Sequence, residues 1–214
     1  MLASSEDQVE VSIHKELLCF FSPYYAAALN GNFSEAQKNR FEVDLLGRDL
    51  ESFATWIYTG YLQQGTQIGR IVTLYIFADQ VDIMALRRDA LGQLSRLDGP
   101  MPNYRQVKQI LKNLTQHSQL YLWTLKCYIN HWVASVDAGD PCPLESDSDP
   151  DNLLAQFIYQ VMKGVTLRRE RDAPGCVCCN DPCQYHEHAS KAEWEASKLS
   201  QSARSRYYCL LTIS

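Results

Sequence analysis

The sequence predicts an α+β fold in which a few short strands pack with several helices and an α-helical extension follows. Two runs, residues 8–13 and 41–45, alternate apolar and polar residues, and this period of two indicates half-buried strands. Most other apolar residues recur at three- and four-residue spacing, which is typical of amphipathic helices. The 214 residues are 46% hydrophobic and 21% charged, an ordinary globular composition.

The first strand leads into a helical pattern over residues 14–21. Ser22 and Pro23 then suit the N-cap and the first position of a second helix, because a serine side chain accepts a backbone hydrogen bond there and proline has the required φ. Asn30 and Gly31 are expected to end that helix. The start and the end of this helix are therefore both encoded locally.

A third helix is expected after the second strand, with Asp49 as a candidate N-cap and Gly60 as its end. Helical spacing of apolar residues predicts two more helices, over residues 70–79 and 84–97. The first segment thus contains short strands and about five helices by this pattern.

Glycine and proline at 99–102 mark a boundary. The chain then divides into residues 1–98, a helical extension over 103–171, and a Cys/His-rich tail over 172–214. The net charge of −5 lies wholly in residues 1–99. Three amphipathic helices are expected in the extension, with stripes that run from Tyr104 to Leu114, from Tyr121 to Trp132 and from Leu154 to Val165.

Several motifs follow one another in a fixed order between residues 8 and 97. They are His14-Lys15-Glu16-Leu17-Leu18, Ser22-Pro23-Tyr24-Tyr25, Ala28-Leu29, Phe33-Ser34-Glu35, Phe53 with Ile57-Tyr58-Thr59-Gly60, and residues 74–79 with Ile83 and Leu86. This order resembles the BTB/POZ domain, in the variant of filamentous fungi that carries a helical C-terminal extension. The resemblance implies a non-enzymatic protein–protein interaction module.

One feature departs from that family. A BTB/POZ domain usually begins with a hairpin whose second strand ends in His-Lys, whereas this chain starts only a few residues before Val9. The first strand is therefore predicted to be missing, which leaves a strand edge unpaired. Either the domain is shortened at its start, or another segment or partner fills the gap. Because the leading region contributes to homodimers in the family, homodimerisation is not expected.

Eight cysteines require an explanation. The first twenty residues contain four acids and lack the layout of a signal peptide, so we expect an intracellular protein, in the cytoplasm or nucleus, with reduced thiols. Four soft ligands lie within eleven residues and suit one structural zinc ion: Cys176, Cys179, Cys183 and His186, with Cys178 and His188 as alternatives. The competing interpretation is a reduced, cysteine-rich surface loop without metal.

Phe33 and Glu35 form a second candidate site. In cullin-binding BTB proteins, a hydrophobic-x-Glu tripeptide lies just before the strand that residues 41–45 match. Phe33 would then anchor a groove contact and Glu35 would fix its register. The alternative is that Phe33 belongs to the core.

These observations favour an interaction module that acts either as an adaptor for a cullin-type ubiquitin ligase or as an oligomerising scaffold. The alternative is a transcription- or chromatin-associated regulator with a small zinc-stabilised Cys/His loop. The acidic balance argues against nucleic acid as the main partner, and no stretch reaches the ~20 apolar residues of a membrane span. No catalytic residue and no cofactor other than structural zinc is expected.

Overall fold

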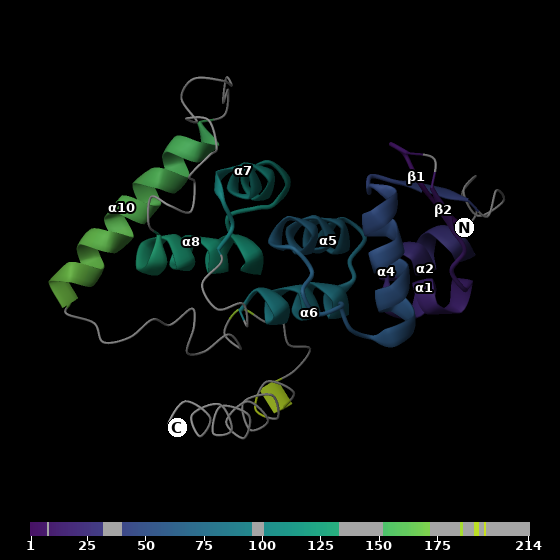
Figure 1. Ribbon diagram of the computed structural model, residues 1–214. Coiled ribbons are helices and arrows are strands. Elements are labelled where there is room, and N and C mark those ends of the chain that lie inside the picture. The colour runs from purple at the N-terminus through teal and green to yellow at the C-terminus, as the bar shows by residue number, and fades with distance from the viewer. Residues whose placement is uncertain are drawn as a thin grey trace, which may run out of the picture.

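The structure, a computed structural model, describes residues 1–7, 9–31, 40–95, 101–132 and 152–171, together with residues 185, 191, 192 and 195. This part of the chain combines a small three-stranded sheet with helices that account for most of its residues (Figure 1). The predicted α+β class is therefore confirmed.

The sheet has the order β2-β1-β3, so its first strand is central. β1 (Leu2–Ser4) pairs antiparallel with β2 (Glu10–Val11) and parallel with β3 (Phe41–Val43). Leu2 lies opposite Val11 on one side and Phe41 on the other. β1 and β2 thus form a hairpin, and β3 returns from a distant part of the chain to complete the sheet.

The prediction that the first strand is missing is wrong, because β1 occupies that place. All three of its residues are buried, so buried and exposed positions do not alternate along the strand, and the period-two pattern of a half-buried strand is absent. The turn after β1 is held locally, since the Ser4 hydroxyl accepts hydrogen bonds from the backbone N–H groups of Glu6 and Asp7. The edge of β2 that was expected to be unpaired is hydrogen-bonded to β1. The reason given for not expecting a homodimer, a missing first strand, therefore no longer holds.

Helices α1 (Lys15–Phe21) and α2 (Pro23–Asn30) follow β2, as predicted. The Ser22 side chain accepts a hydrogen bond from Tyr25 N–H at 3.0 Å, and Pro23 occupies the first position of α2. The Gly31 N–H donates to the Ala27 carbonyl and closes the last turn. The Ser22 hydroxyl also donates to the Val81 carbonyl, which fastens this helix pair to the end of α5.

α4 (Gly47–Thr59), α5 (Ile68–Gln80) and α6 (Met84–Leu94) form the remainder of the first segment. Gly60 ends α4 in the left-handed region, at φ 76°, as its position predicted. The prediction that Asp49 caps α4 is wrong. The helix begins two residues earlier, and Asp49 lies inside its first turn.

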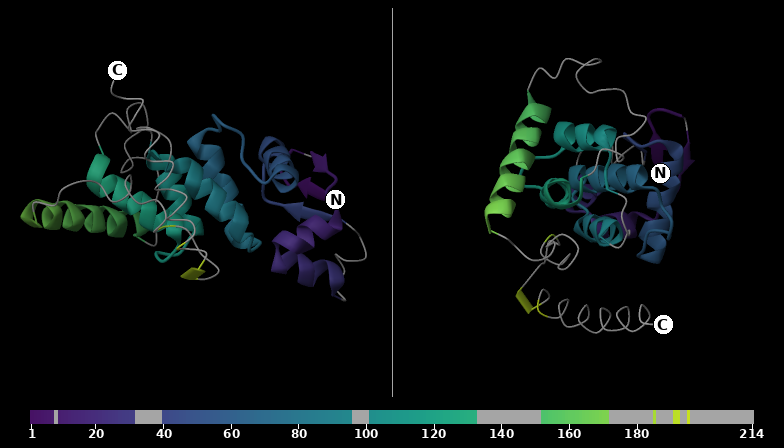
Figure 2. Two further views of the ribbon diagram at one scale, coloured as in Figure 1. Left: turned by 90° about the horizontal axis from the view of Figure 1, so that it is seen from below. Right: turned by 60° about the vertical axis from the view of Figure 1, so that its left-hand side comes forward.

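The extension contains α7 (Tyr104–Asn113), α8 (Gln119–His131) and α10 (Leu153–Arg171). α7 packs on α5, and α10 packs mainly on α8 (Figures 1 and 2). The Phe157 ring of α10 packs in T-shaped geometry against the rings of Tyr121 and Tyr128 on α8, with centroid distances of 5.9 and 5.4 Å. The sheet and α10 consequently lie at opposite ends of the molecule, with α5 to α8 between them (Figure 2).

One hydrophobic core runs through both segments. Its largest fully buried aromatic side chains are those of Tyr25, Phe53, Trp56 and Tyr75. No helix in the described ranges is long and apolar enough to cross a membrane.

Candidate functional site

The two sites predicted from sequence fall outside the described residues. This applies to the partner-binding pair Phe33 and Glu35, and to the zinc ligands Cys176, Cys178, Cys179, Cys183, His186 and His188. One neighbour of those ligands, Tyr185, is described, and its ring is 95% buried in the core cluster. Among the residues that the structure describes, no group of three or more His, Cys, Asp or Glu side chains could hold a metal ion.

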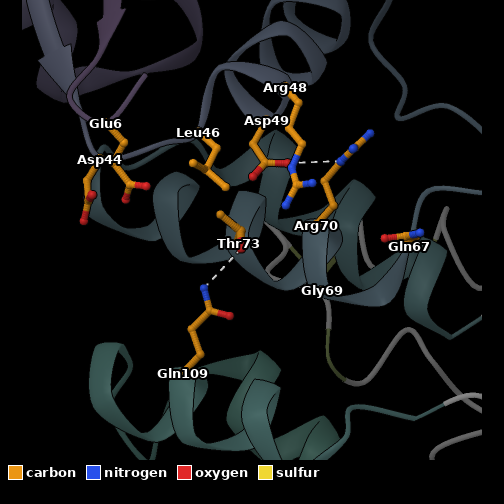
Figure 3. Close-up of a pocket in the computed structure, with 10 residues that line it drawn as sticks. All are labelled: Glu6, Asp44, Leu46, Arg48, Asp49, Gln67, Gly69, Arg70, Thr73 and Gln109. Carbon is orange, nitrogen blue, oxygen red and sulfur yellow. Dashed lines mark hydrogen bonds and ion pairs between the residues drawn. The ribbon is translucent and has the colours of Figure 1, made fainter. Parts of the chain in front are cut away.

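A polar cleft lies beside the β1–β2 turn (Figure 3). It has a volume of about 300 Å³ and lies where the β1–β2 turn, the start of α4, the start of α5 and the side of α7 meet. Its lining residues are Glu6, Asp44, Leu46, Arg48, Asp49, Gln67, Gly69, Arg70, Thr73 and Gln109. Most of them are polar or charged, so the cleft suits a polar ligand.

The hairpin turn is joined to α4 at the back of this cleft. Asp7 in the turn accepts a hydrogen bond from Gly47 N–H at 2.7 Å, so its carboxylate takes the place of the missing side-chain cap of α4. Hydrogen bonds from Ser4 and from the Gly47 backbone lower the pKa of Asp7. A Cβ atom at Gly47 would overlap the Val9 side chain, so glycine permits this close approach.

Asp49 and Arg70 form an ion pair inside the cleft. Arg70 Nε lies 3.0 Å from Asp49 Oδ1, and the Asp49 residue is only 4% exposed (Figure 3). Burial raises the pKa of Asp49, and the charges of Arg70 and Arg48 offset that effect only in part. The pair holds the Arg70 side chain through Nε, and one third of that side chain is exposed.

The exposed Arg48 side chain also lines the cleft, and it forms no hydrogen bond or ion pair with a described residue. Arg48 and Arg70 also line a second hollow of about 360 Å³ on the neighbouring face of α4. The two arginines therefore form the partition between two polar hollows. A ligand in either hollow meets guanidinium groups, which recognise carboxylate and phosphate oxygens.

The opposite end of the cleft is acidic. Glu6 and Asp44 both line it there, and neither forms an ion pair with a described residue (Figure 3). Between the two ends, Gln109 of α7 donates a hydrogen bond to Thr73 of α5 at 3.1 Å and forms a neutral polar wall. The cleft thus has two carboxylates at one end and two guanidinium groups at the other.

Exposed aromatic side chains form another candidate contact surface on the first segment. Phe20, Tyr24, Tyr58 and Tyr61 are all at least half exposed, and Phe20 reaches 79%. The Tyr58 hydroxyl accepts a hydrogen bond from the His14 backbone N–H and lies 2.7 Å from the His14 Nδ1 atom. Exposed aromatic residues of this kind supply anchors in protein–protein interfaces.

Sequence reasoning did not predict the cleft. Its lining comes from four segments that are distant along the chain, and no local motif joins them. Comparison with known proteins adds no assignment. No protein-family model matches the chain, and no curated protein matches it either. Its function has to be inferred from its own residues and geometry.

Proposed function

We propose that this chain is a non-enzymatic protein–protein interaction module with a BTB/POZ-like core. The observation that carries the proposal is the β1–β2 hairpin, which runs directly into His14 and Lys15 at the start of α1. The motif resemblance requires a hairpin at this place, and the amino-acid sequence had given no sign of its first strand.

The positions of the other motifs support the same proposal. The Ser22-Pro23 motif forms the junction of α1 and α2, and the Tyr58-Thr59-Gly60 motif ends α4. Residues 74–79 lie in α5, which packs on α6. Each motif therefore has a structural role as a cap, a helix end or a buried helix face.

The exposed aromatic residues of the first segment supply contact chemistry. Large apolar side chains at a monomer surface contribute to binding when a partner covers them. Phe20 and Tyr24 lie on adjacent helices, and Tyr61 lies just after the end of α4. An interaction module is expected to expose such residues.

The specific role that we propose is an adaptor for a cullin-type ubiquitin ligase. In the sequence, Phe33 and Glu35 follow the last residue of α2 and precede the first residue of β3, as the hydrophobic-x-Glu tripeptide precedes its strand in cullin-binding members of the family. In this role the apolar side chain enters a groove of the cullin, and the carboxylate sets the register.

Pull-down with the N-terminal region of a cullin tests this role. We expect the wild-type chain to be retained and both Phe33→Ala and Glu35→Lys to reduce retention, with unchanged circular dichroism. The matched controls are Tyr159→Ala on α10 and Glu16→Lys, which alter an exposed aromatic residue and an exposed acid that the proposal does not place at the cullin contact. Absence of retention, or equal retention of all variants, would rule out the adaptor role.

The proposal also includes self-association, because the leading hairpin contributes to homodimers in the BTB/POZ family. Light scattering on the purified chain measures it directly, since the monomer has a mass of 24.4 kDa. A mass near twice that value supports a homodimer, whereas a concentration-independent monomer excludes it.

A further inference from the structure

We propose that the polar cleft between the hairpin turn, α4, α5 and α7 is a docking site for a short segment of a partner protein that carries one basic and one acidic side chain. The basic side chain lies against Glu6 and Asp44, and the acidic side chain lies against Arg48 and Arg70 (Figure 3). The inference rests on the proposed function only in taking the ligand to be a protein.

The charges at the arginine end support an acidic group there. Arg70 is held in place by the buried Asp49 through Nε, so little side-chain entropy remains to be lost when a ligand binds. The Arg48 side chain has no bonded partner among the described residues. With two guanidinium groups and one buried carboxylate, this end of the cleft has a net charge of +1, which attracts an acidic group.

The charges at the other end support a basic group. Glu6 and Asp44 come from the hairpin turn and from the residue that follows β3, and both line the same end of the cleft (Figure 3). No described cation pairs with either one, whereas the neighbouring Glu10 is paired with Arg40 at 2.9 Å. A lysine or arginine of a partner would be attracted to these two negative charges.

The middle of the cleft suits a peptide backbone. Thr73 and Gln109 supply hydroxyl and amide groups there, and such groups both donate and accept hydrogen bonds (Figure 3). The volume of about 300 Å³ is at the small end of ligand pockets, which fits a few residues rather than a folded element. The arrangement differs from a simple anion site, because a phosphate group would use only the arginine end.

Titration of the full chain with blocked tetrapeptides, followed by amide NMR spectra, tests the inference. The probe is acetyl-Lys-Ala-Ala-Glu-amide, and the comparison peptides replace lysine, glutamate or both by glutamine. We expect the largest shifts at the amides of the residues that line the cleft. Each glutamine replacement should weaken binding about two- to fivefold, the factor that one exposed charge pair contributes. Raising NaCl from about 20 to about 200 mM should weaken it further.

Variants of the protein provide the second arm. Arg48→Gln should lose the preference for glutamate, and Glu6→Gln with Asp44→Asn should lose the preference for lysine. Lys112→Gln and Glu16→Gln, which change exposed charges outside the cleft, should bind as the wild type does. These side chains are all exposed, so folding is expected to survive their substitution.

Three results would overturn the inference: no shifts in the cleft, equal affinity for all four peptides, or equal binding by the cleft variants and their controls. Inorganic phosphate provides a further control. If it shifts the same amides as the peptide, and the Glu6 and Asp44 variants make no difference, the cleft is an anion site and the two-ended proposal is wrong. The cullin and light-scattering experiments are independent of these results, so the failure of one proposal is distinguishable from the failure of the other.

Discussion

The ion pair in the cleft allows a quantitative prediction, because Asp49 is buried and has Arg70 as its cation. Removing one partner of a fully buried pair costs about 3–5 kcal/mol, whereas an exposed pair contributes about 0.2–1 kcal/mol. Asp49 is 4% exposed but the Arg70 side chain is 33% exposed, so this pair lies between the two cases. We expect Arg70→Met to lower the free energy of unfolding by about 1–3 kcal/mol at neutral pH.

The control is Arg48→Met, the same substitution at an exposed arginine of the same cleft, which should change stability by no more than about 0.5 kcal/mol. Urea unfolding followed by circular dichroism gives both values. In an Asp49→Asn background, Arg70→Met should cost much less, because no buried charge is then left without its cation.

The loss of unfolding free energy caused by Arg70→Met should depend on pH, and the direction of this dependence follows from the pKa of Asp49. Burial raises the pKa of Asp49 above its ordinary value of 3.8, so the folded state binds a proton at a higher pH than the unfolded state does. As the pH falls from neutral through the raised pKa, folded Asp49 becomes neutral and the cost of burying its charge disappears. The deficit of Arg70→Met should therefore shrink toward acidic pH. A deficit that is constant with pH, or equal to that of Arg48→Met, would refute the reasoning.

Three further predictions concern the hairpin, the extension and the tail. Gly47→Ala should lower the free energy of unfolding by about 1–3 kcal/mol in urea titrations, because its Cβ would overlap the Val9 side chain and force the hairpin away from α4; an unchanged unfolding midpoint would contradict this contact. Gly164→Ala should likewise lower the free energy of unfolding by about 1–3 kcal/mol, because its Cβ would overlap Cδ1 and Cγ1 of Ile129 on α8, a β-branched side chain with little freedom at χ1; an unchanged unfolding midpoint would show that Ile129 repacks without cost. Native mass spectrometry should show one zinc ion per chain that a chelator removes, and an identical apo mass with and without chelator would end the zinc proposal.

The helices could be predicted from the sequence because their signals are local. Ser22 and Pro23 start α2 by cap chemistry within three residues, and Gly60 ends α4 because glycine adopts positive φ at little cost. Neither feature depends on the rest of the fold. The start of α2 and the end of α4 can therefore be predicted without knowledge of the tertiary structure.

The features that the sequence did not reveal depend on contacts between distant segments. β1 is central and buried on both faces, so its three residues show no alternation. Aspartate is a residue type that favours the N-cap, which made Asp49 a candidate. In the structure Asp7, forty residues before Gly47 along the chain, accepts the hydrogen bond from the Gly47 N–H group, and Asp49 forms an ion pair with Arg70. Secondary-structure propensities and capping rules consider only a few neighbouring residues, so they cannot predict the pairing of β1 with distant strands or the contact of Asp7 with α4.

The hairpin connects the two proposals physically. Its strands complete the sheet that supports the BTB/POZ-like interpretation, and its turn supplies Asp7 to α4 and Glu6 to the cleft. The far wall of the cleft is Gln109 of α7, so the extension takes part in the same site as the core. A partner segment bound there would contact the hairpin, the core helices and the extension at once. Its binding would consequently stabilise the arrangement of all three, and the charge pattern of the cleft would select which partner does so.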